Sequence, residues 1–275
     1  MRSMGKRSKI EDKAKRLWGN DLFKNNSAPP HCIQFESIFK EKWISSFKGE
    51  LLEIGCGSGT DLEIFSSHDD LKKITAIDLG KKNIERLVKR YSNRSDICVE
   101  RGNALSLDFE DEKFDVIYSF GVFHHTASPI KCITEAKRVL KKNGSIFLYL
   151  YGAHEDLLYK RLGVLLEKLI MKIFKYLPYS MQNLICIILS PICWAIFSVP
   201  SLLLRLLGYN SFSKKLPFYF GTHPFSIIED LKDRLMSPIN HRFSKLEMEN
   251  ILYDIGFSLA EVVKKPSGLY IYLRK

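Results

Sequence analysis

The sequence lacks the cysteine patterns of disulfide-stabilised or zinc-binding proteins. Its six cysteines form no C-x-x-C pair and no cysteine and histidine cluster at zinc spacing. We therefore expect reduced, mostly buried thiols and no metal site. Reduced cysteines are typical of a cytoplasmic protein. No apolar stretch follows the basic amino terminus, so we expect no secretory signal.

Acidic residues are scarcer than basic ones. The chain has 31 aspartates and glutamates against 42 lysines and arginines, which gives a formal net charge of +11. This excess favours an anionic neighbour, either nucleic acid or the headgroups of a membrane, and charge alone does not choose between them. With 275 residues, 45% of them hydrophobic, the chain can form one large core and a smaller second unit.

Short apolar runs alternate with amphipathic stretches through the first half of the chain. The runs cover residues 51–55, 74–78, 97–104, 114–120 and 145–151, and helical patterns start near residues 61, 82 and 130. Continuous apolar strands separated by helices indicate a parallel sheet that is covered on both faces. We therefore predict a doubly wound α/β fold.

The last 32 residues complete this sheet. Ser244 and Glu247 form a capping box for a helix over residues 245–255, which Gly256 is placed to end. Two strand-like segments follow, joined by a short turn. Such a short connection requires an antiparallel hairpin, so one edge of the mostly parallel sheet should carry an antiparallel strand.

The chain divides into three predicted parts. Residues 1–48 are charged and helical in pattern and should form an N-terminal helical cap. Residues 49–151 and 244–275 should form the α/β core. Residues 152–243 are too many for a loop. They should form a helical insertion after the fifth strand, which binds a substrate or associates with a membrane.

Three glycines follow the first predicted strand, at Gly55, Gly57 and Gly59 in EIGCGSGT. A dinucleotide-binding turn, G-x-G-x-x-G, would need glycine at position 60, where Thr60 stands. Bare backbone after a buried strand allows a ligand to approach the peptide N–H groups closely. A tight turn without a ligand remains the alternative for these glycines taken alone.

Polar residues follow the next two predicted strands. Asp78 stands 19 residues after Gly59, where a carboxylate can accept hydrogen bonds from both hydroxyls of a ribose. Asn103, next to Ala104, offers a donor and an acceptor to an adenine edge. Helix capping by Asp78 and a turn role for Asn103 are the alternatives. The glycines, the carboxylate and the amide together predict an adenosine site.

These motifs resemble those of the class I S-adenosylmethionine-dependent methyltransferases, a seven-stranded family with a reversed last strand. The resemblance rests on EIGCGSGT, ITAID, GNA, FDVIYSFGVFHH and EAKRVLKKNGSIFLYLYG, and covers roughly half of the chain. It implies S-adenosylmethionine as the cofactor. The residues that it implies around the cofactor are Glu53, Gly55, Gly57, Gly59, Asp78, Leu79, Asn103, Ala104, Ser119 and Phe120. Ser119 and Phe120 would flank the sulfonium. Many relatives carry Asp in place of Asn103, but an amide oxygen can accept the same hydrogen bond.

Methyl transfer from a sulfonium requires alignment of the acceptor more than activation of the donor. A base is needed only if the acceptor loses a proton. His124 and His125 follow the fourth strand and are the predicted catalytic residues, His124 being preferred because it is nearer the strand end. Packing or backbone hydrogen bonding is the alternative. For Tyr149, Tyr151 and His241 we expect packing or polar support.

Charged residues are absent from the 29 residues 176–204. This run exceeds the ~20 apolar residues that a spanning helix needs. Pro191 and Pro200 would each remove a helical hydrogen bond, so we do not expect a single clean transmembrane helix. The flanking basic residues are Lys160, Arg161, Lys168, Lys172, Lys175, Arg205, Lys214 and Lys215. They favour attachment to one leaflet of an anionic membrane. Helices packed around a covered acceptor pocket are the alternative.

We therefore predict a cytoplasmic S-adenosylmethionine-dependent methyltransferase, located at the inner face of the membrane if the insertion contacts lipid. Its acceptor should be a small molecule of lipid-like or amphiphilic character. Nucleic acid is the alternative acceptor, disfavoured because no N/D-P-P-Y/F tetrapeptide follows the fourth strand. A non-catalytic binding protein on the same fold is the third interpretation. The sequence determines neither the acceptor atom nor the oligomeric state.

Overall fold

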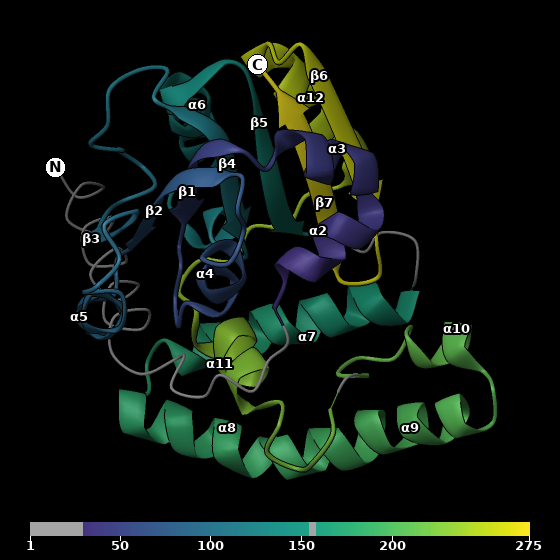
Figure 1. Ribbon diagram of the computed structural model, residues 1–275. Helices are drawn as coiled ribbons and strands as arrows, with labels where there is room; N and C mark the ends of the chain where they lie inside the picture. Colours follow the sequence, from purple (N-terminus) through teal and green to yellow (C-terminus); the bar gives the residue numbers. More distant parts are fainter. Residues whose placement is uncertain (1–29, 154–157, 220) are drawn as a thin grey trace, which may run out of the picture. The chain divides into compact units, whose positions relative to one another are not determined.

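The chain folds into two compact units, which we describe separately. The computed structural model describes residues 30–153, 158–219 and 221–275 (Figure 1). Met1–Ala153 and Ile239–Lys275 make up the first unit, called the α/β unit below, and His154–Pro238 make up the second, called the helical unit. Most of the predicted cap, residues 1–29, lies outside the described residues.

Seven strands form one sheet in the α/β unit, in the order β3-β2-β1-β4-β5-β7-β6. The strands are β1 (Gly49–Ile54), β2 (Leu71–Asp78), β3 (Ile97–Arg101), β4 (Phe114–Phe120), β5 (Leu140–Tyr151), β6 (Leu259–Lys264) and β7 (Gly268–Arg274). The first five strands pair in parallel, whereas β7 runs antiparallel to both β5 and β6. The predicted doubly wound fold is confirmed, as is the antiparallel hairpin at one edge.

Helices cover the two faces of this sheet. They are α2 (Cys32–Ile38), α3 (Lys40–Ser46), α4 (Thr60–Phe65), α5 (Lys81–Arg90), η1 (Phe123–His125), α6 (Pro129–Val139) and α12 (Lys245–Ile255). One hydrophobic cluster gathers side chains of α2 to α5, and a second gathers those of α6 and α12. The sheet is therefore the middle layer of three.

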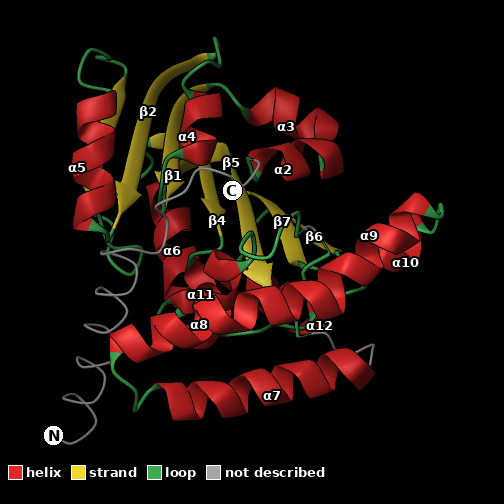
Figure 2. Cartoon of the chain, turned by 90° about the horizontal axis from the view of Figure 1, so that it is seen from below, coloured by secondary structure: helices red, strands yellow, loops and turns green. Residues whose placement is uncertain are grey.

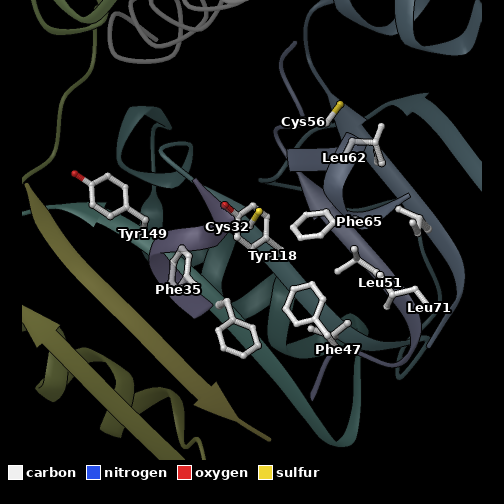
Figure 3. Close-up of a cluster of buried hydrophobic side chains, with 14 of the residues drawn as sticks. Cys32, Phe35, Phe47, Leu51, Cys56, Leu62, Phe65, Leu71, Tyr118 and Tyr149 are labelled. Atoms are coloured by element: carbon white, nitrogen blue, oxygen red, sulfur yellow. The ribbon is translucent and has the colours of Figure 1, made fainter. Parts of the chain in front are cut away.

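Aromatic side chains anchor the two N-terminal helices on the sheet (Figure 3). The ring of Phe35 in α2 meets that of Tyr118 in β4 edge to face, with centroids 5.6 Å apart. The ring centroid of Phe47, at the end of α3, lies 5.3 Å from that of Phe65 in α4. Residues 32–47 are thus part of the core layer instead of a cap ahead of it.

Local signals explain how α12 begins and ends. Ser244 accepts a hydrogen bond from the backbone N–H of Glu247, whose side chain accepts one in return from the N–H of Ser244. Gly256 ends the helix with a left-handed φ of 79°. Both features are confirmed as predicted, because capping depends on residues only a few positions apart.

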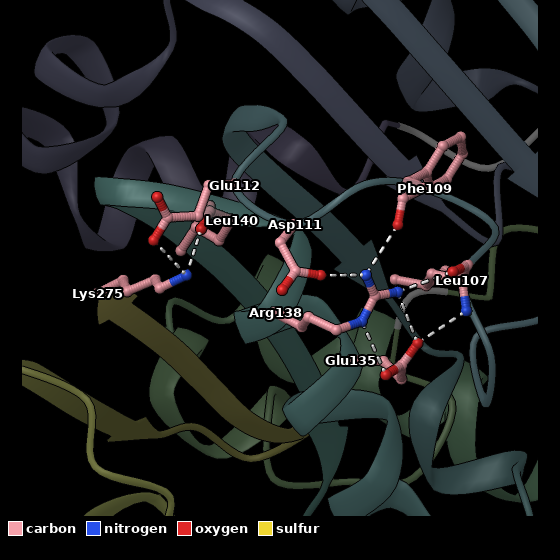
Figure 4. Close-up of polar contacts among 8 residues, drawn as sticks. All are labelled: Leu107, Phe109, Asp111, Glu112, Glu135, Arg138, Leu140 and Lys275. Carbon is pink, nitrogen blue, oxygen red and sulfur yellow. Dashed lines mark hydrogen bonds and ion pairs between the residues drawn. The ribbon is translucent and has the colours of Figure 1, made fainter.

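Arg138 of α6 fixes the loop between β3 and β4 (Figure 4). Its guanidinium donates to the carbonyl oxygens of Leu107 and Phe109 and to the carboxylates of Asp111 and Glu135. Glu135 also accepts from the N–H of Leu107 at 3.0 Å. This network holds the loop that carries residues 102–105, which lie at one side of the cavity described below.

The helical unit contains one helix much longer than the others (Figure 2). Its elements are α7 (Leu158–Phe174), α8 (Tyr179–Cys193), the π-turn η2 (Trp194–Ser198), α9 (Val199–Leu206), α10 (Asn210–Ser213) and α11 (Ile228–Met236). Helix α11 contacts both α7 and α8. The segments α8, η2 and α9 join without a break into a 28-residue helix, Tyr179–Leu206, called the long helix below.

The two prolines lie within the long helix and do not end it. Pro191 lies inside α8 and Pro200 lies in the first turn of α9, with the π-turn between them. A wider turn of this kind is how helices commonly absorb an irregularity in their hydrogen bonding. By length and composition the long helix could cross a membrane.

The helical unit begins and ends slightly inside the predicted insertion. Phe243 forms a β-bridge with Gly152, and its N–H donates to the carbonyl of Tyr151 at the end of β5. Residues 239–243 therefore belong with the α/β unit.

Candidate functional site

A cavity opens at the carboxyl ends of β1, β2 and β4, within the α/β unit. The residues around it are His31, Glu53, Ile54, Gly55, Cys56, Gly57, Ser58, Thr60, Asp61, Ile77, Asp78, Leu79, Gly102, Asn103, Ala104, Leu105, Tyr118, Phe120, Gly121, Val122, His125, Thr126, Ala127 and Ile239. Ligands of doubly wound sheets bind at this edge, where the strand order reverses. Here the reversal lies between β1 and β4, which flank the cavity.

The glycine turn after β1 has a backbone that other residues would strain. Gly55, Gly57 and Gly59 have φ of 81°, 50° and 83°. A Cβ on Gly55 would come within 2.2 Å of a methyl group of Val122, and one on Gly59 within 2.4 Å of a methyl group of Leu87. Gly55 and Gly57 line the cavity, whereas Gly59 does not and instead allows close packing of α4 on α5.

Asp78 ties the end of β2 to the glycine turn. One carboxylate oxygen accepts from the N–H of Gly57 at 3.0 Å and the other from the N–H of Gly80 at 2.6 Å. Burial raises the pKa of Asp78, and the two N–H groups oppose this rise. A carboxylate has about four lone-pair sites, so two remain for a ligand. Leu79 also lines the cavity.

Asn103 and Ala104 border the cavity on the loop held by Arg138. The Asn103 side-chain oxygen accepts from the N–H of Leu105 at 3.0 Å, which makes the residue part of a turn. The turn role and the position beside the cavity are compatible, since the amide nitrogen does not take part in that bond.

Glu53 is the most unusual polar group in the cavity. Its side chain is buried, and among the described residues its Oε2 atom has no hydrogen-bond partner. Burial raises its pKa well above the usual value, and the neighbouring charges of Asp61 and Asp78 raise it further. A buried carboxyl of this kind would be stabilised by a cationic ligand.

Ser119 and Phe120 do not both flank the cavity, so this prediction needs correction. Ser119 is fully buried and its hydroxyl donates to the carbonyl of Ile54 at 3.0 Å. Phe120 lines the cavity and stacks on Tyr149, with ring centroids 4.2 Å apart. The two residues differ because successive side chains of a strand point to opposite faces.

The preference for His124 over His125 is reversed in the structure. His124 is completely buried, stacks on Tyr151 at 4.0 Å, and has no hydrogen-bond partner for either ring nitrogen among the described residues. Burial lowers its pKa well below the usual value, so it binds a proton poorly. His125 lines the cavity, and its Nδ1 atom lies 2.9 Å from the carbonyl oxygen of Ile239.

The remaining candidates have packing or support roles. The hydroxyl of Tyr149 donates to the carbonyl of Ser267, and its ring stacks on Phe120. The N–H of His241 donates to the carbonyl of His124, and burial lowers the pKa of the His241 imidazole.

His31 also lines the cavity and contacts the carboxylate of Asp61. The sequence alone did not single out this histidine. Its Nδ1 atom lies 3.4 Å from Asp61, and its ring stacks on Phe120 at 4.1 Å. Asp61 also accepts from the backbone N–H groups of His31 and Cys32 and from the hydroxyl of Tyr118. Burial would raise the pKa of Asp61, but these hydrogen bonds outweigh it and hold the pKa below the usual value. Asp61 is therefore ionised and orients His31.

The order of the seven strands and the antiparallel hairpin at one edge match the α/β fold of methyltransferases. Residues 52–148 match the family model described as a methyltransferase domain. Over these residues, about a third of the chain, the protein is similar to methyltransferase domains.

Two curated relatives carry names with different acceptors. The 27-O-demethylrifamycin SV methyltransferase of Amycolatopsis mediterranei is 32% identical over 101 residues, or 36% of this chain and 37% of that protein. The tRNA U34 carboxymethyltransferase of Sulfurimonas denitrificans is 27% identical over 139 residues, or 44% and 46%. The chain thus matches less than half of the length of each. The two relatives match this chain over a similar region, but their names indicate different substrates.

A solved structure matches over a longer stretch. The citrinin polyketide synthase CMeT domain has a TM-score of 0.51 and covers 88% of this chain and 52% of its own. At 11% identity this likeness shows the fold alone.

Proposed function

We propose that the α/β unit binds S-adenosylmethionine in the cavity and transfers its methyl group to a small-molecule acceptor. The observation that carries this proposal is the buried Glu53 carboxyl, whose Oε2 atom has no partner among the described residues and which stands beside Asp78 and the glycine turn. A cationic, ribose-bearing ligand would match all three features.

The residues present fit such a cofactor. Asp78 has lone pairs left for the ribose hydroxyls. Glu53 would compensate the positive charge at the methionine end, and Asn103 would face the adenine. When bound, S-adenosylmethionine supplies a methyl group on a positively charged sulfur, which is already activated for transfer.

The protein contributes alignment and, where the acceptor must lose a proton, a base. His31 is our choice for this base, since it lines the cavity and Asp61 orients its Nδ1 side. A neutral imidazole with hydrogen on Nδ1 can accept a proton at Nε2. His125 is the second candidate. His124 is withdrawn, because it is buried outside the cavity wall.

The acceptor that we propose is lipid-like or amphiphilic. The support is the apolar helical unit, which follows β5 in the chain and exposes many large apolar side chains. In a family with a shared cofactor fold, inserted segments of this kind commonly set substrate choice. Nucleic acid is the competing acceptor, supported by the net charge of +11.

The test uses S-adenosylmethionine labelled in its methyl group. The protein is incubated separately with total lipid, aqueous metabolites and total tRNA from the source cells, and each fraction is searched by mass spectrometry for a gain of one methylene. We expect label in the lipid fraction and none with Asp78→Ala. Label confined to tRNA would contradict the proposed acceptor but not the proposed cofactor.

A further inference from the structure

The long helix buries four polar side chains and exposes many large apolar ones. Gln182, Ser190, Ser198 and Ser201 are 2%, 0%, 0% and 0% exposed. The exposed large apolar residues of the same helix are Tyr179, Met181, Leu184, Ile187, Ile188, Ile192, Ile196, Leu202, Leu203 and Leu206. This is the reverse of the pattern on a helix that covers a water-soluble core.

These four side chains all donate hydrogen bonds to backbone carbonyls of the helical unit. The Gln182 amide donates to the carbonyl oxygens of Phe174 and Leu177. Ser190 donates to the carbonyl of Pro224, and Ser198 to that of Phe218. Side chains that hydrogen-bond inward while apolar groups face outward are typical of helices surrounded by lipid. Only 17% of the most apolar window of this helix is buried, so it is not the core helix of a globular unit.

Helix α7 carries an exposed apolar stripe with basic residues along one side. The stripe consists of Leu158, Leu162, Leu165, Leu166, Leu169 and Ile173, at helical steps of three and four residues. Arg161, Lys168 and Lys172 are also exposed and follow one another at steps of seven and four. They form a second row beside the stripe. The Lys160 side chain lies outside the described part of the chain.

We infer that the helical unit docks on a lipid bilayer that carries anionic headgroups. The apolar sides of α7 and of the long helix enter the hydrocarbon boundary, and the basic row of α7 meets lipid phosphates. Charge complementarity selects this occupant over a second copy of the chain. A second copy would bring its own lysines to the same surface, where like charges disfavour pairing. Anionic lipids instead attract each lysine and arginine.

Vesicle flotation tests this inference with a matched pair of variants. Leu162→Glu with Leu169→Glu places two carboxylates on the α7 stripe, at side chains 57% and 55% exposed. Leu246→Glu with Tyr253→Glu does the same on α12 of the α/β unit, at side chains 69% and 84% exposed and with the same spacing of seven residues. On vesicles of phosphatidylcholine and phosphatidylglycerol, we expect the first pair to weaken binding at least tenfold and the second by less than twofold.

A second set of variants isolates the charge. Arg161→Gln, Lys168→Gln and Lys172→Gln together should lower binding to the mixed vesicles about a hundredfold, because each cation near an anionic surface contributes roughly 1 kcal/mol and 1.4 kcal/mol is a factor of ten. Binding to phosphatidylcholine alone should not change. Lys72→Gln, Lys73→Gln and Lys89→Gln remove three exposed charges from the α/β unit and should leave flotation unchanged.

Two outcomes would overturn the inference. One is equal flotation of the unaltered protein and the α7 double variant. The other is no flotation at all, with a concentration-dependent dimer that the α7 variant abolishes. The inference does not depend on methyl transfer. S-adenosylmethionine binding is measured separately on the same samples, so loss of membrane binding and loss of cofactor binding can be distinguished.

Discussion

The two units of this chain differ in how many large apolar side chains they expose. Among its described residues, the α/β unit exposes few large apolar side chains, and they are scattered: Ile33, Ile44, Ile64, Val88, Ile130, Leu246, Tyr253 and Leu259. The smaller helical unit exposes more than twice as many, concentrated on α7, on the long helix and just beyond it. Scattered apolar residues are normal on proteins in water, whereas large contiguous patches mark interaction surfaces. Among the described residues, the comparison shows that the large exposed apolar surface lies on the helical unit and not on the α/β unit.

Their buried polar groups differ as well. Around the cavity of the α/β unit the buried polar groups include the carboxyls of Glu53 and Asp61. Along the long helix they are hydroxyls and one amide, bonded to backbone carbonyls. Buried ionisable groups with displaced pKa values cluster where ligands bind, and satisfied neutral groups serve structure. This difference agrees with the two proposals above, a ligand site in the first unit and membrane docking by the second.

The largest expected effect comes from removing the carboxylate that orients His31. Asp61→Ala leaves the N–H groups of His31 and Cys32 and the hydroxyl of Tyr118 without their charged acceptor. Since removing one partner of a buried charged network typically costs about 3–5 kcal/mol, we expect the free energy of unfolding to fall by about that amount at pH 7. Urea unfolding measures it, with the exposed Asp69→Ala as control.

The difference in free energy of unfolding between the unaltered protein and Asp61→Ala should become smaller at acid pH. The pKa of Asp61 is lowered in the folded protein, so its contribution is present above the pKa of an unfolded aspartate and disappears as the pH falls through the folded value. A difference between the protein and Asp61→Ala that is independent of pH would count against an ionised Asp61.

Alanine substitutions at two glycines separate the cost of backbone strain from the cost of a steric clash. Gly55 in the turn and Gly208 in the helical unit have nearly equal φ, 81° and 84°. A Cβ on Gly55 meets Val122 at 2.2 Å, whereas one on Gly208 meets nothing within 4 Å. Gly208→Ala should lose about 1–2 kcal/mol from backbone strain alone. Gly55→Ala should lose about 2–4 kcal/mol and bind cofactor at least tenfold more weakly. Equal stability losses would show that the turn is not tightly packed.

Glu53 should make the ligand-free protein less stable at high pH. Its folded pKa is raised, so the stability it supports is complete below the pKa of an unfolded glutamate and is lost as the pH rises through the folded value. Glu53→Gln cannot ionise and should therefore be more stable than the protein at pH 8, by roughly 1–2 kcal/mol, and equal to it near pH 4. Thermal unfolding at both pH values tests this. The same variant should bind S-adenosylmethionine more weakly, so a gain in affinity would contradict the role of Glu53.

Much of the α/β unit was predictable because its signals are local. The run FDVIYSF is β4 at the predicted bounds, and the capping box of Ser244 and Glu247 starts α12 as expected. Gly55, Gly57 and Asp78 line one cavity, since the glycine turn follows β1 and Asp78 ends β2 at the same edge of the sheet.

The rest depended on contacts between distant residues. His31 and Asp61 are 30 residues apart, and no spacing rule connects them. Ser119 was misplaced because the sequence does not say which side chain of a buried strand faces the ligand. His124 and His125 are sequence neighbours within η1, and only the structure shows that His125 lines the cavity whereas His124 does not. The long helix continues past its prolines through a π-turn that no pattern predicted.

Titration calorimetry with S-adenosylmethionine and with NAD tests the central claim most directly. We expect saturable heat with S-adenosylmethionine and none with NAD, because Thr60 stands where a dinucleotide turn needs glycine. Asp78→Ala should weaken S-adenosylmethionine at least tenfold, while the exposed Asp69→Ala leaves it unchanged. Binding of NAD, or equal S-adenosylmethionine affinity in the protein and Asp78→Ala, would contradict the assignment of this cavity.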